Sequence, residues 1–362
     1  MAFPPTWEFP EPDARAASAA RARQDTLTKP RGSLGALEEL AVELAAIQGG
    51  PPASRPAAAV LFAADHPVTR HGVSAYPPEV TAAMVANFVS GGAAASVLCR
   101  HLGVELRIVD VGVAHPYEPA PGGDGGGAAA RLRRDPVAGD PIGDLRVEDA
   151  LSEAVYERAL RAGAAEIDAL GGDTRVVLLG EMGIGNTTAA AAIAALLLDL
   201  PAEDLVGAGT GVAGDALARK IEVVRDATRR VVQAARDPHR VVRSVGGKEI
   251  AALVGAAARA IERRMAVLVD GFIVSTAALA LVRMDARARR GMLFAHRSAE
   301  RGHARVLAAL DARPLLDLGM RLGEASAALA ALPLLDAACA LHAGMATFAS
   351  ASVPDRAPPG AP

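Results

Sequence analysis

Aromatic side chains are scarce in this chain, since Phe, Trp and Tyr together make up only 3% of its 362 residues. The core therefore has to be built from Ala, Leu, Val and Ile, and 51% of all residues are hydrophobic. This apolar content is typical of a globular protein with a large core. The length by itself fits two or three domains, or one α/β domain that carries additions.

The chain also lacks an excess of charge, because its formal net charge is only −3. A nucleic-acid-binding protein normally shows a basic excess, so we expect no nucleic-acid partner. The two cysteines, Cys99 and Cys339, lie in apolar helical patterns without the spacing of a redox or metal motif. Residues 1–12 lack the apolar segment of a signal peptide, and no apolar run is convincing as a membrane span. We therefore expect a cytoplasmic protein with no membrane partner.

Short β-branched or Leu-rich runs alternate with longer Ala-rich runs along the chain. This alternation predicts an α/β fold with a parallel, Rossmann-like sheet and helices on both faces. Strands are expected at 58–63, 104–109, 175–179, 266–269 and 292–294. Helices are expected at 34–47, 79–102, 149–170, 187–198, 215–235, 248–263, 273–284 and 299–310. Ligands of such sheets bind at the carboxyl ends of the strands.

The helix expected at 34–47, with Ser33 as its N-cap, precedes the first strand and indicates a smaller helical subdomain. Helices expected around 329–348 would join it. The expected boundaries are 1–55 and 321–352 for the subdomain, 56–320 for the α/β core and 353–362 for a disordered tail. Within the core, residues 119–144 are rich in Gly, Pro, Ala and Asp and predict a flexible surface excursion.

The sequence GEMGIGNTT at residues 180–188 follows an expected strand and opens an expected helix. Gly183 and Gly185 permit tight turns, and the helix start at Thr187 offers free N–H groups and a positive dipole end, which together suit a phosphate. Asn186 stands where a P-loop has its lysine, so a monophosphate is favoured over a nucleoside triphosphate. The alternative is a structural turn without a ligand, but a purely structural turn gives no reason for the acidic residue Glu181 at this place.

Two further loops carry weaker signals. The glycine-rich segment 207–214, which includes Gly209, fits a mononucleotide loop, and Lys220 in the next helix either reaches a phosphate or is a surface lysine. Asp65, His66 and His71 follow the first strand, where a structural or pocket-lining role is favoured over metal binding. No metal site is expected.

Three single residues leave two interpretations each. Asp270 follows a strand and either holds a ribose hydroxyl or caps a helix. Ser298 is expected to be a helix N-cap, and the same position would suit a phosphate. Glu324, in the segment RLGE, is either a partly buried general base or a helix-start glutamate favoured by the helix dipole.

Several of these segments resemble one known family, the nicotinate-nucleotide–dimethylbenzimidazole phosphoribosyltransferases of cobalamin biosynthesis. The resemblance covers residues from about 20 to 350 and rests on KPRGSLGALEEL at 29–40, ADH at 64–66 with GVS at 72–74, GEMGIGNTT at 180–188 and RLGE at 321–324. The segments 270–272 and 296–302 agree in order and context.

The resemblance implies a homodimer with a parallel α/β sheet and a small helical subdomain built from both chain ends. It also implies that a nitrogen of a benzimidazole-type base displaces nicotinate at C1′ of nicotinate mononucleotide, with inversion, to give α-ribazole 5′-phosphate. Departure of nicotinate neutralises its cationic ring, so no cofactor or metal is expected.

The family's residues transfer to matching positions here. Glu324 is then the general base, and Glu181 faces the reacting centre. Taken together with the loops above, the phosphate and ribose site is expected at Gly183, Gly185, Asn186, Thr187, Gly209, Lys220, Asp270 and Ser298. The base pocket is expected at Ser74, Met84, Met182 and Leu322.

Three departures from the family pattern bear on specificity. Pro67 replaces a usual glycine, residues 81–84 lack an expected glutamine, and Val212–Gly214 replaces an acid-containing stretch. The first two concern which base is accepted, and the third concerns contacts to ribose. Two other functions stay open: a related transferase acting on another base or a phenolic acceptor, and a mononucleotide-binding protein without catalysis, which would not need Glu324.

Overall fold

The computed structural model describes residues 6–118, 130–234 and 236–354. Its centre is a six-stranded parallel sheet with the order β3-β2-β1-β4-β5-β6. The strands are β1 Ala57–Ala64, β2 Glu105–Gly112, β3 Arg131–Arg134, β4 Val176–Met182, β5 Ala266–Val269 and β6 Met292–Phe294. The predicted parallel α/β sheet and its five predicted strands are confirmed, whereas β3 was not predicted.

The strand order reverses between β1 and β4. From β1 the chain moves outward to β2 and β3, and it then returns to β4 and continues outward to β5 and β6. In open parallel sheets the carboxyl ends of the strands at such a switch point form the ligand-binding crevice. The loops that follow β1 and β4 therefore flank the expected site.

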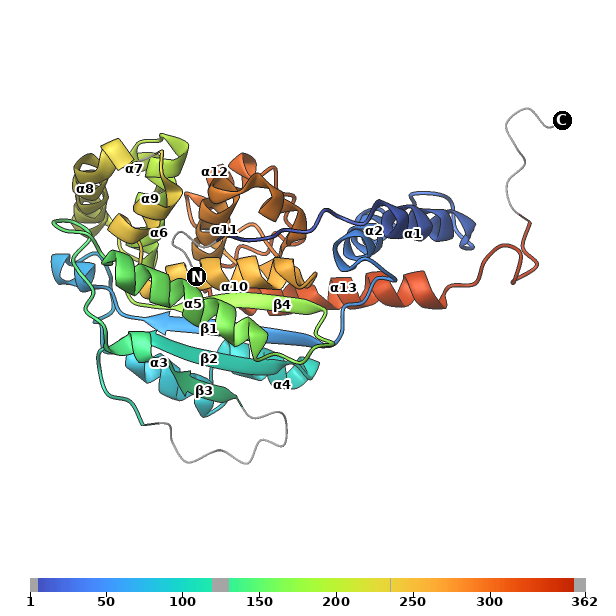
Figure 1. Ribbon diagram of the computed structural model, residues 1–362, viewed down its shortest axis with the longest axis horizontal. Coiled ribbons are helices and arrows are strands. Elements are labelled where there is room, and N and C mark those ends of the chain that lie inside the picture. Colours follow the sequence, from blue (N-terminus) through green and yellow to red (C-terminus); the bar gives the residue numbers. More distant parts are fainter. Residues whose placement is uncertain (1–5, 119–129, 235, 355–362) are drawn as a thin grey trace.

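Helices cover both faces of the sheet (Figure 1). Their bounds are α1 Ala14–Thr26, α2 Ala36–Gln48, α3 Val80–Val89, α4 Ala94–Leu102, α5 Glu153–Asp168, α6 Asn186–Leu198, α7 Ala202–Leu205, α8 Gly214–Val231, α9 Pro238–Val245, α10 Lys248–Glu262, α11 Phe272–Met284, α12 His303–Ala309 and α13 Ser326–Gly344. Alternate residues of β1 face opposite sides, so Val60 and Phe62 join the core beneath α5, α6, α10 and α11, while Leu61 joins the core beneath α3, α4 and α13.

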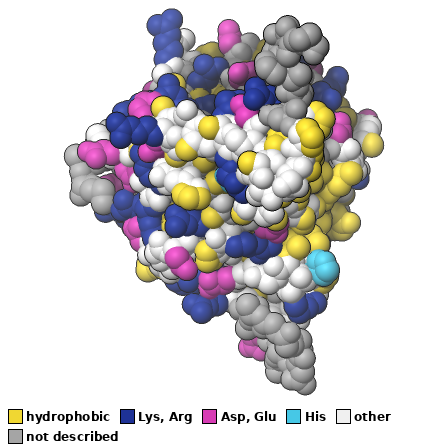
Figure 2. All heavy atoms as spheres, turned by 90° about the vertical axis from the view of Figure 1, so that its right-hand side faces the viewer, with side chains coloured by type: hydrophobic (Ala, Val, Ile, Leu, Met, Phe, Trp, Pro, Cys, Tyr) yellow, Lys and Arg dark blue, Asp and Glu magenta, His cyan; other side chains and the backbone are white. Residues whose placement is uncertain are grey.

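Segments from both chain ends meet at one end of the molecule. There α1 and α2 lie side by side against α13 (Figure 1). The Arg23 side chain donates to the carbonyl of His342, and the Thr28 N–H donates to the carbonyl of Ala346. Figure 2 views this end, where hydrophobic side chains gather along one side among charged ones. The domain boundaries expected from the sequence stay predictions.

Three expectations about helices are wrong. The helix expected at 79–102 is two helices, because the chain turns at residues 90–93, where Gly91 has a φ of +83°. Ser33 is not an N-cap, since α2 begins at Ala36 after Gly35. Ser298 is not an N-cap either, because α12 begins only at His303, after Gly302.

The excursion expected at 119–144 is ordered in its second half. Residues 119–129 lie outside the described residues, but the chain from Arg131 pairs with β2 as an edge strand. Arg134 and Tyr117 both donate to the buried carboxylate of Asp110, while Arg133 donates to Glu166. These charge-assisted bonds outweigh the polar composition that predicted a loose loop. Of the tail expected at 353–362, residues 355–362 lie outside the described residues.

Within the part of the chain that the structure describes, two segments are long and apolar enough to cross a membrane, namely Val80–Leu102 and Ser326–Gly344. By itself this is weak evidence, because core helices of globular proteins pass the same test. Both segments supply side chains to the core on one face of the sheet.

Candidate active site

Three buried carboxyl groups meet at the carboxyl end of the sheet. Glu181 belongs to the end of β4, Asp270 directly follows β5, and Glu324 lies two residues before α13. A Cβ at Gly180 would lie 2.5 Å from the backbone nitrogen of Ala325, so β4 runs directly against the segment that carries Glu324. The structure thus brings together the two residues predicted to be catalytic.

Gly323 sets how closely the two acids approach. It has a φ of +84°, and a Cβ on it would collide with the Glu181 carboxylate. The next two residues, Glu324 and Ala325, also have positive φ angles of 63° and 58°. Such conformations cost a non-glycine residue about 1–3 kcal/mol and persist only where the surroundings enforce them. This strained turn places the Glu324 carboxyl group beside β4.

Asp270 anchors that turn. Its Oδ1 accepts a 2.8 Å hydrogen bond from the N–H of Ala328, in the first turn of α13. Asp270 therefore caps a helix, which was one of the two interpretations of this residue. The capped helix is α13 and not α11, the helix that follows Asp270 in sequence. The arrangement does not by itself assign Asp270 to a ribose hydroxyl.

Burial and mutual repulsion make these groups titrate near neutrality. Burial raises the pKa of Glu181 to about 8, with further increases from Asp270, Glu249 and Glu324, against a lowering hydrogen bond from Asn186. Burial, followed by repulsion from Asp270, raises the pKa of Glu324 to about 7. A carboxyl group with a pKa near the working pH is suited to proton transfer.

The loop between β4 and α6 brings further predicted residues to the same edge. Gly185 has a φ of +100°, and α6 begins at Asn186. The Asn186 amide donates to the Glu181 carboxylate, which explains why asparagine fits where a P-loop has lysine. The Thr187 hydroxyl accepts a 2.8 Å hydrogen bond from Lys220 Nζ. The segment therefore joins the acid cluster to a buried cation.

Lys220 is a buried lysine, so its interpretation as a surface residue is wrong. Its side chain is 1% exposed, and Nζ also donates to the carbonyl of Gly207 at 3.2 Å. Burial lowers its pKa to about 8, while the Glu300 carboxylate opposes that shift. A Cβ at Gly209 would lie 2.7 Å from Nζ and 2.8 Å from the Thr187 hydroxyl, so only glycine fits this approach.

Ser298 and Arg321 connect the remaining loops to this cation. Ser298 Oγ accepts from the N–H of Glu300, whose carboxylate lies against Gly207. The Arg321 guanidinium donates to the carbonyl of Gly209 at 2.9 Å. The glycine-rich loop is thus held between the segment that contains Ser298 and the segment that contains Glu324.

The residues predicted for the base pocket do not all lie together. Met182 is buried in the core beneath α3, and Met84 packs against the same cluster. Leu322 is 57% exposed and lies at the surface. The Ser74 hydroxyl shares a 3.0 Å hydrogen bond with the hydroxyl of Thr210, so Ser74 lies against the glycine-rich loop. Met84 and Met182 thus belong to one apolar cluster, whereas Leu322 lies outside it.

The Asp and His residues after β1 have separate protein partners. His66 Nε2 lies 2.7 Å from Glu249 Oε1, and His71 Nε2 lies 2.7 Å from Asp144 Oδ2. Within the described ranges no group of three His, Cys, Asp or Glu side chains has the arrangement of a metal site. Glu249 and Glu300 were not predicted, because an acid in or near the first turn of a helix is common for the helix dipole alone.

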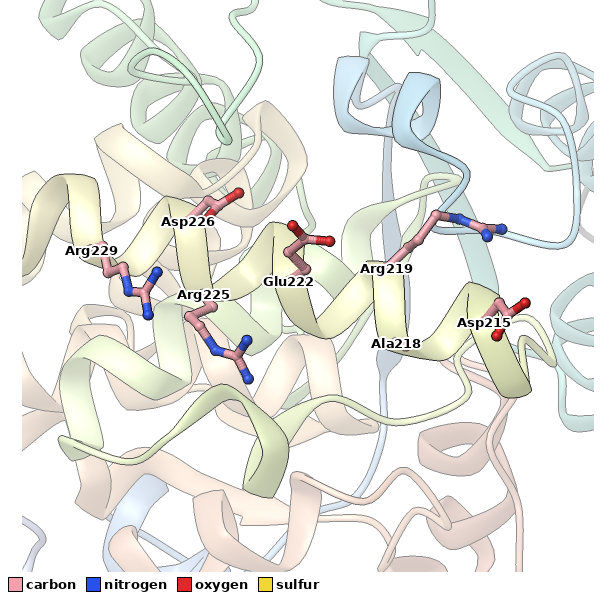
Figure 3. A pocket seen from close by; sticks show the side chains of 7 residues that line it. All are labelled: Asp215, Ala218, Arg219, Glu222, Arg225, Asp226 and Arg229. Carbon is pink, nitrogen blue, oxygen red and sulfur yellow. The ribbon is translucent and has the colours of Figure 1, made fainter.

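A surface hollow on α8 is not part of this site. Figure 3 shows the side chains that line it, and they project from the exposed face of that helix. They are Asp215, Ala218, Arg219, Glu222, Arg225, Asp226 and Arg229. Lys220 is buried and is not among them. Helix α8 therefore has an exposed charged face, and its buried face carries Lys220 of the candidate site.

The fold and the site are those of an α/β enzyme with a parallel sheet, in which buried acids lie at the carboxyl end of the strands. Residues 9–353 match the family model described as "Phosphoribosyltransferase". The chain belongs to this phosphoribosyltransferase family.

Similar proteins and structures agree with that family. A nicotinate-nucleotide–dimethylbenzimidazole phosphoribosyltransferase of Bradyrhizobium sp. (strain ORS 278) is 51% identical, over 97% of this chain and 99% of the relative. One of Azotobacter vinelandii is 49% identical, over 95% and 96%. The crystal structure of CobT from Thermus thermophilus matches with a TM-score of 0.85 and 40% identity, covering 94% of this chain and 99% of that one.

Proposed function

We propose that this protein transfers the phosphoribosyl group of nicotinate mononucleotide to 5,6-dimethylbenzimidazole or a related base. Nicotinate and α-ribazole 5′-phosphate are the products. The observation that carries the proposal is the placement of Glu324 and Glu181 against each other at the end of β4, beside the loop that reaches Lys220. The names of the similar proteins support the same reaction.

In this reaction a nitrogen of the base attacks C1′ on the face opposite nicotinate. The C1′–N bond to nicotinate breaks, its electron pair passes to the ring nitrogen, and the ring becomes neutral. The proton on the other azole nitrogen goes to Glu324, whose pKa of about 7 lets the carboxylate accept it. The configuration at C1′ inverts, and no metal or cofactor is required.

The remaining residues hold and stabilise the reacting groups. In its ionised form, whose share grows as the pH rises towards its pKa of about 8, Glu181 stabilises the positive charge that develops on the ribose. The 5′-phosphate binds where the start of α6, Lys220 and the loop of Gly209 converge, with Ser298 at its edge. Holding the two reactants in line is the protein's main contribution to the rate of such a displacement. Met84 and Met182 form apolar walls for the base.

A product assay tests the proposal. The protein is incubated with nicotinate mononucleotide and 5,6-dimethylbenzimidazole in the presence and absence of a chelator, and both products are followed by chromatography and mass. Equal amounts of nicotinate and riboside phosphate, unaffected by the chelator, are expected. Product only with another base or with a phenol would establish a related transferase instead. Mononucleotide binding without product from any acceptor would establish a binding protein.

We further propose that the protein is a cytoplasmic homodimer. Exposed apolar side chains at Leu318 and Leu322, close in sequence to Glu324, support a surface that a second copy covers. Light scattering coupled to size-exclusion chromatography should give twice the chain mass of 36.9 kDa. A mass of one chain across the working concentration range would contradict the dimer.

A further inference from the structure

A buried His–Glu pair lies under the candidate site, and the proposed mechanism does not use it. His66 follows β1, and Glu249 lies in the first turn of α10. Their side chains are 1% and 0% exposed, and Nε2 lies 2.7 Å from Oε1. Burying two charges carries a large desolvation cost, which is offset only when their contact is good.

The segment that carries His66 packs directly against the loop between β4 and α6. A Cβ at Gly185 would lie 3.1 Å from the Cβ of His66 and 3.0 Å from a methyl carbon of Thr69. A Cβ at Gly183 would collide with the carbonyl of Ala64. Both glycines thus rest directly on this segment, and the position of His66 affects the turn that leads to Asn186 and Thr187.

The pair also sets the charge next to Glu181. The acids that act on Glu181 are Asp270 from the end of β5, Glu324 from the turn before α13 and Glu249 from α10, with the Asn186 amide opposing them. Among the described residues, Glu249 Oε2 has no hydrogen-bond partner, so its contact with His66 through Oε1 is the main compensation for its charge.

The neighbours of His66 favour its protonated form. Burial by itself lowers the pKa of His66, but the carboxylates of Glu249 and Asp65 more than reverse this and raise it. Lys248, beside Glu249, reaches away from the pair, because its Nζ donates to the carbonyl of Asp140. His66, when protonated, is therefore the cation in direct contact with Glu249.

We propose that the His66–Glu249 ion pair is a positioning element of the transfer reaction. The imidazolium partly offsets the charge of Glu249, so that a larger share of Glu181 is ionised, and the same segment supports the turn at Gly183 and Gly185. This inference rests on the proposed function, in which Glu181 acts on the ribose as an anion.

Glutamine substitutions separate charge from contact. In His66→Gln the amide still donates to Glu249 but carries no charge, so Glu249 repels Glu181 more strongly, and the acid limb of the kcat–pH profile should move to higher pH. In Glu249→Gln one repulsion disappears, so this limb should move to lower pH. Each shift should be about half a pH unit or more. The double variant should return close to the wild-type profile, because neither charge remains.

His71→Gln is the matched control. His71 is also paired with a carboxylate at 2.7 Å, that of Asp144, which is not among the groups that act on Glu181. Its profile should coincide with that of the wild type. Single variants whose limbs stay in place, or move in the same direction, would overturn the inference even if both lost stability.

Titration of the Glu181 carboxyl group keeps the inference separate from the proposed function. The group is followed by infrared difference spectroscopy against Glu181→Gln in each background. Its titration should shift upward in His66→Gln and downward in Glu249→Gln. Absence of transferase activity in the wild-type protein would refute the proposed function. A Glu181 titration that stays at the same pH in both variants would refute the role of the pair.

Discussion

Asp270 and Ala328 are joined by a 2.8 Å hydrogen bond from the backbone N–H of Ala328 to Oδ1 of the acid. The bond ties the end of β5 to the first turn of α13, and Glu324 lies immediately before that turn. Asp270 thus fixes the segment that carries the proposed general base and raises the pKa of that base by its charge. One buried acid therefore serves both the geometry and the electrostatics of the site.

The close approach of Gly323 to Glu181 predicts that Gly323→Ala lowers both stability and turnover. The added methyl group would collide with the carboxylate in a backbone conformation that disfavours side chains, so the free energy of unfolding should fall by about 1–3 kcal/mol.

Gly319→Ala is the matched control for this prediction. Gly319 has a φ of +67°, but a Cβ on it meets nothing within 4 Å. This variant should lose some stability, as measured by urea denaturation, and keep its kcat. Equal kcat values for the two variants would show that the contact with Glu181 is unimportant.

The buried position of Lys220 predicts that Lys220→Ala weakens binding of nicotinate mononucleotide by at least about tenfold, since a charge-assisted contact to phosphate is lost. Ser298→Ala should weaken binding less, because its hydroxyl accepts from a backbone N–H at the edge of the site. Arg229→Ala removes a charge from the exposed face of the same helix and should leave the affinity unchanged. Calorimetric titrations that show the same affinity for the Lys220 variant and the wild type would contradict the phosphate site.

The raised carboxyl pKa values predict that stability falls as pH rises. Glu181 has a pKa of about 8 against an ordinary 4.5, so between these values the folded protein holds a proton that the unfolded chain has released. Glu324 and Asp270 act in the same direction up to about 7 and about 6. The melting temperature should therefore decrease between about pH 5 and about pH 8, and Glu181→Gln should decrease less over this range. An equal slope for both proteins would argue against a buried, protonatable Glu181.

Short buried strands and strand-end loops were predictable from the sequence. The strands Ala266–Val269 and Met292–Phe294 agree with the prediction residue for residue, because each is a brief apolar run followed by polar residues. The placement of Glu181, Thr187 and Glu324 near one edge of the sheet also follows from their positions at the end of a strand or near the start of a helix.

Features that depend on distant partners were not predictable. Strand Arg131–Arg134 has three arginines and is held by ion pairs and by pairing with β2, which no local apolar pattern reveals. His66 and Glu249 are 183 positions apart, so their pairing exists only once the sheet has formed. The positive φ of Glu324 is likewise enforced by contacts from β4 and β5 and not by its own residue type.

The most direct test of the account compares Glu324→Gln with the wild type in turnover and in mononucleotide binding. The amide has nearly the shape of the carboxyl group but cannot take the azole proton, so kcat should fall by about 10²–10⁴-fold. The affinity for nicotinate mononucleotide, measured by calorimetry, should stay within about threefold of wild type, a difference of less than about 1 kcal/mol. Turnover near the wild-type value with this variant would contradict Glu324 as the general base and with it the proposed mechanism.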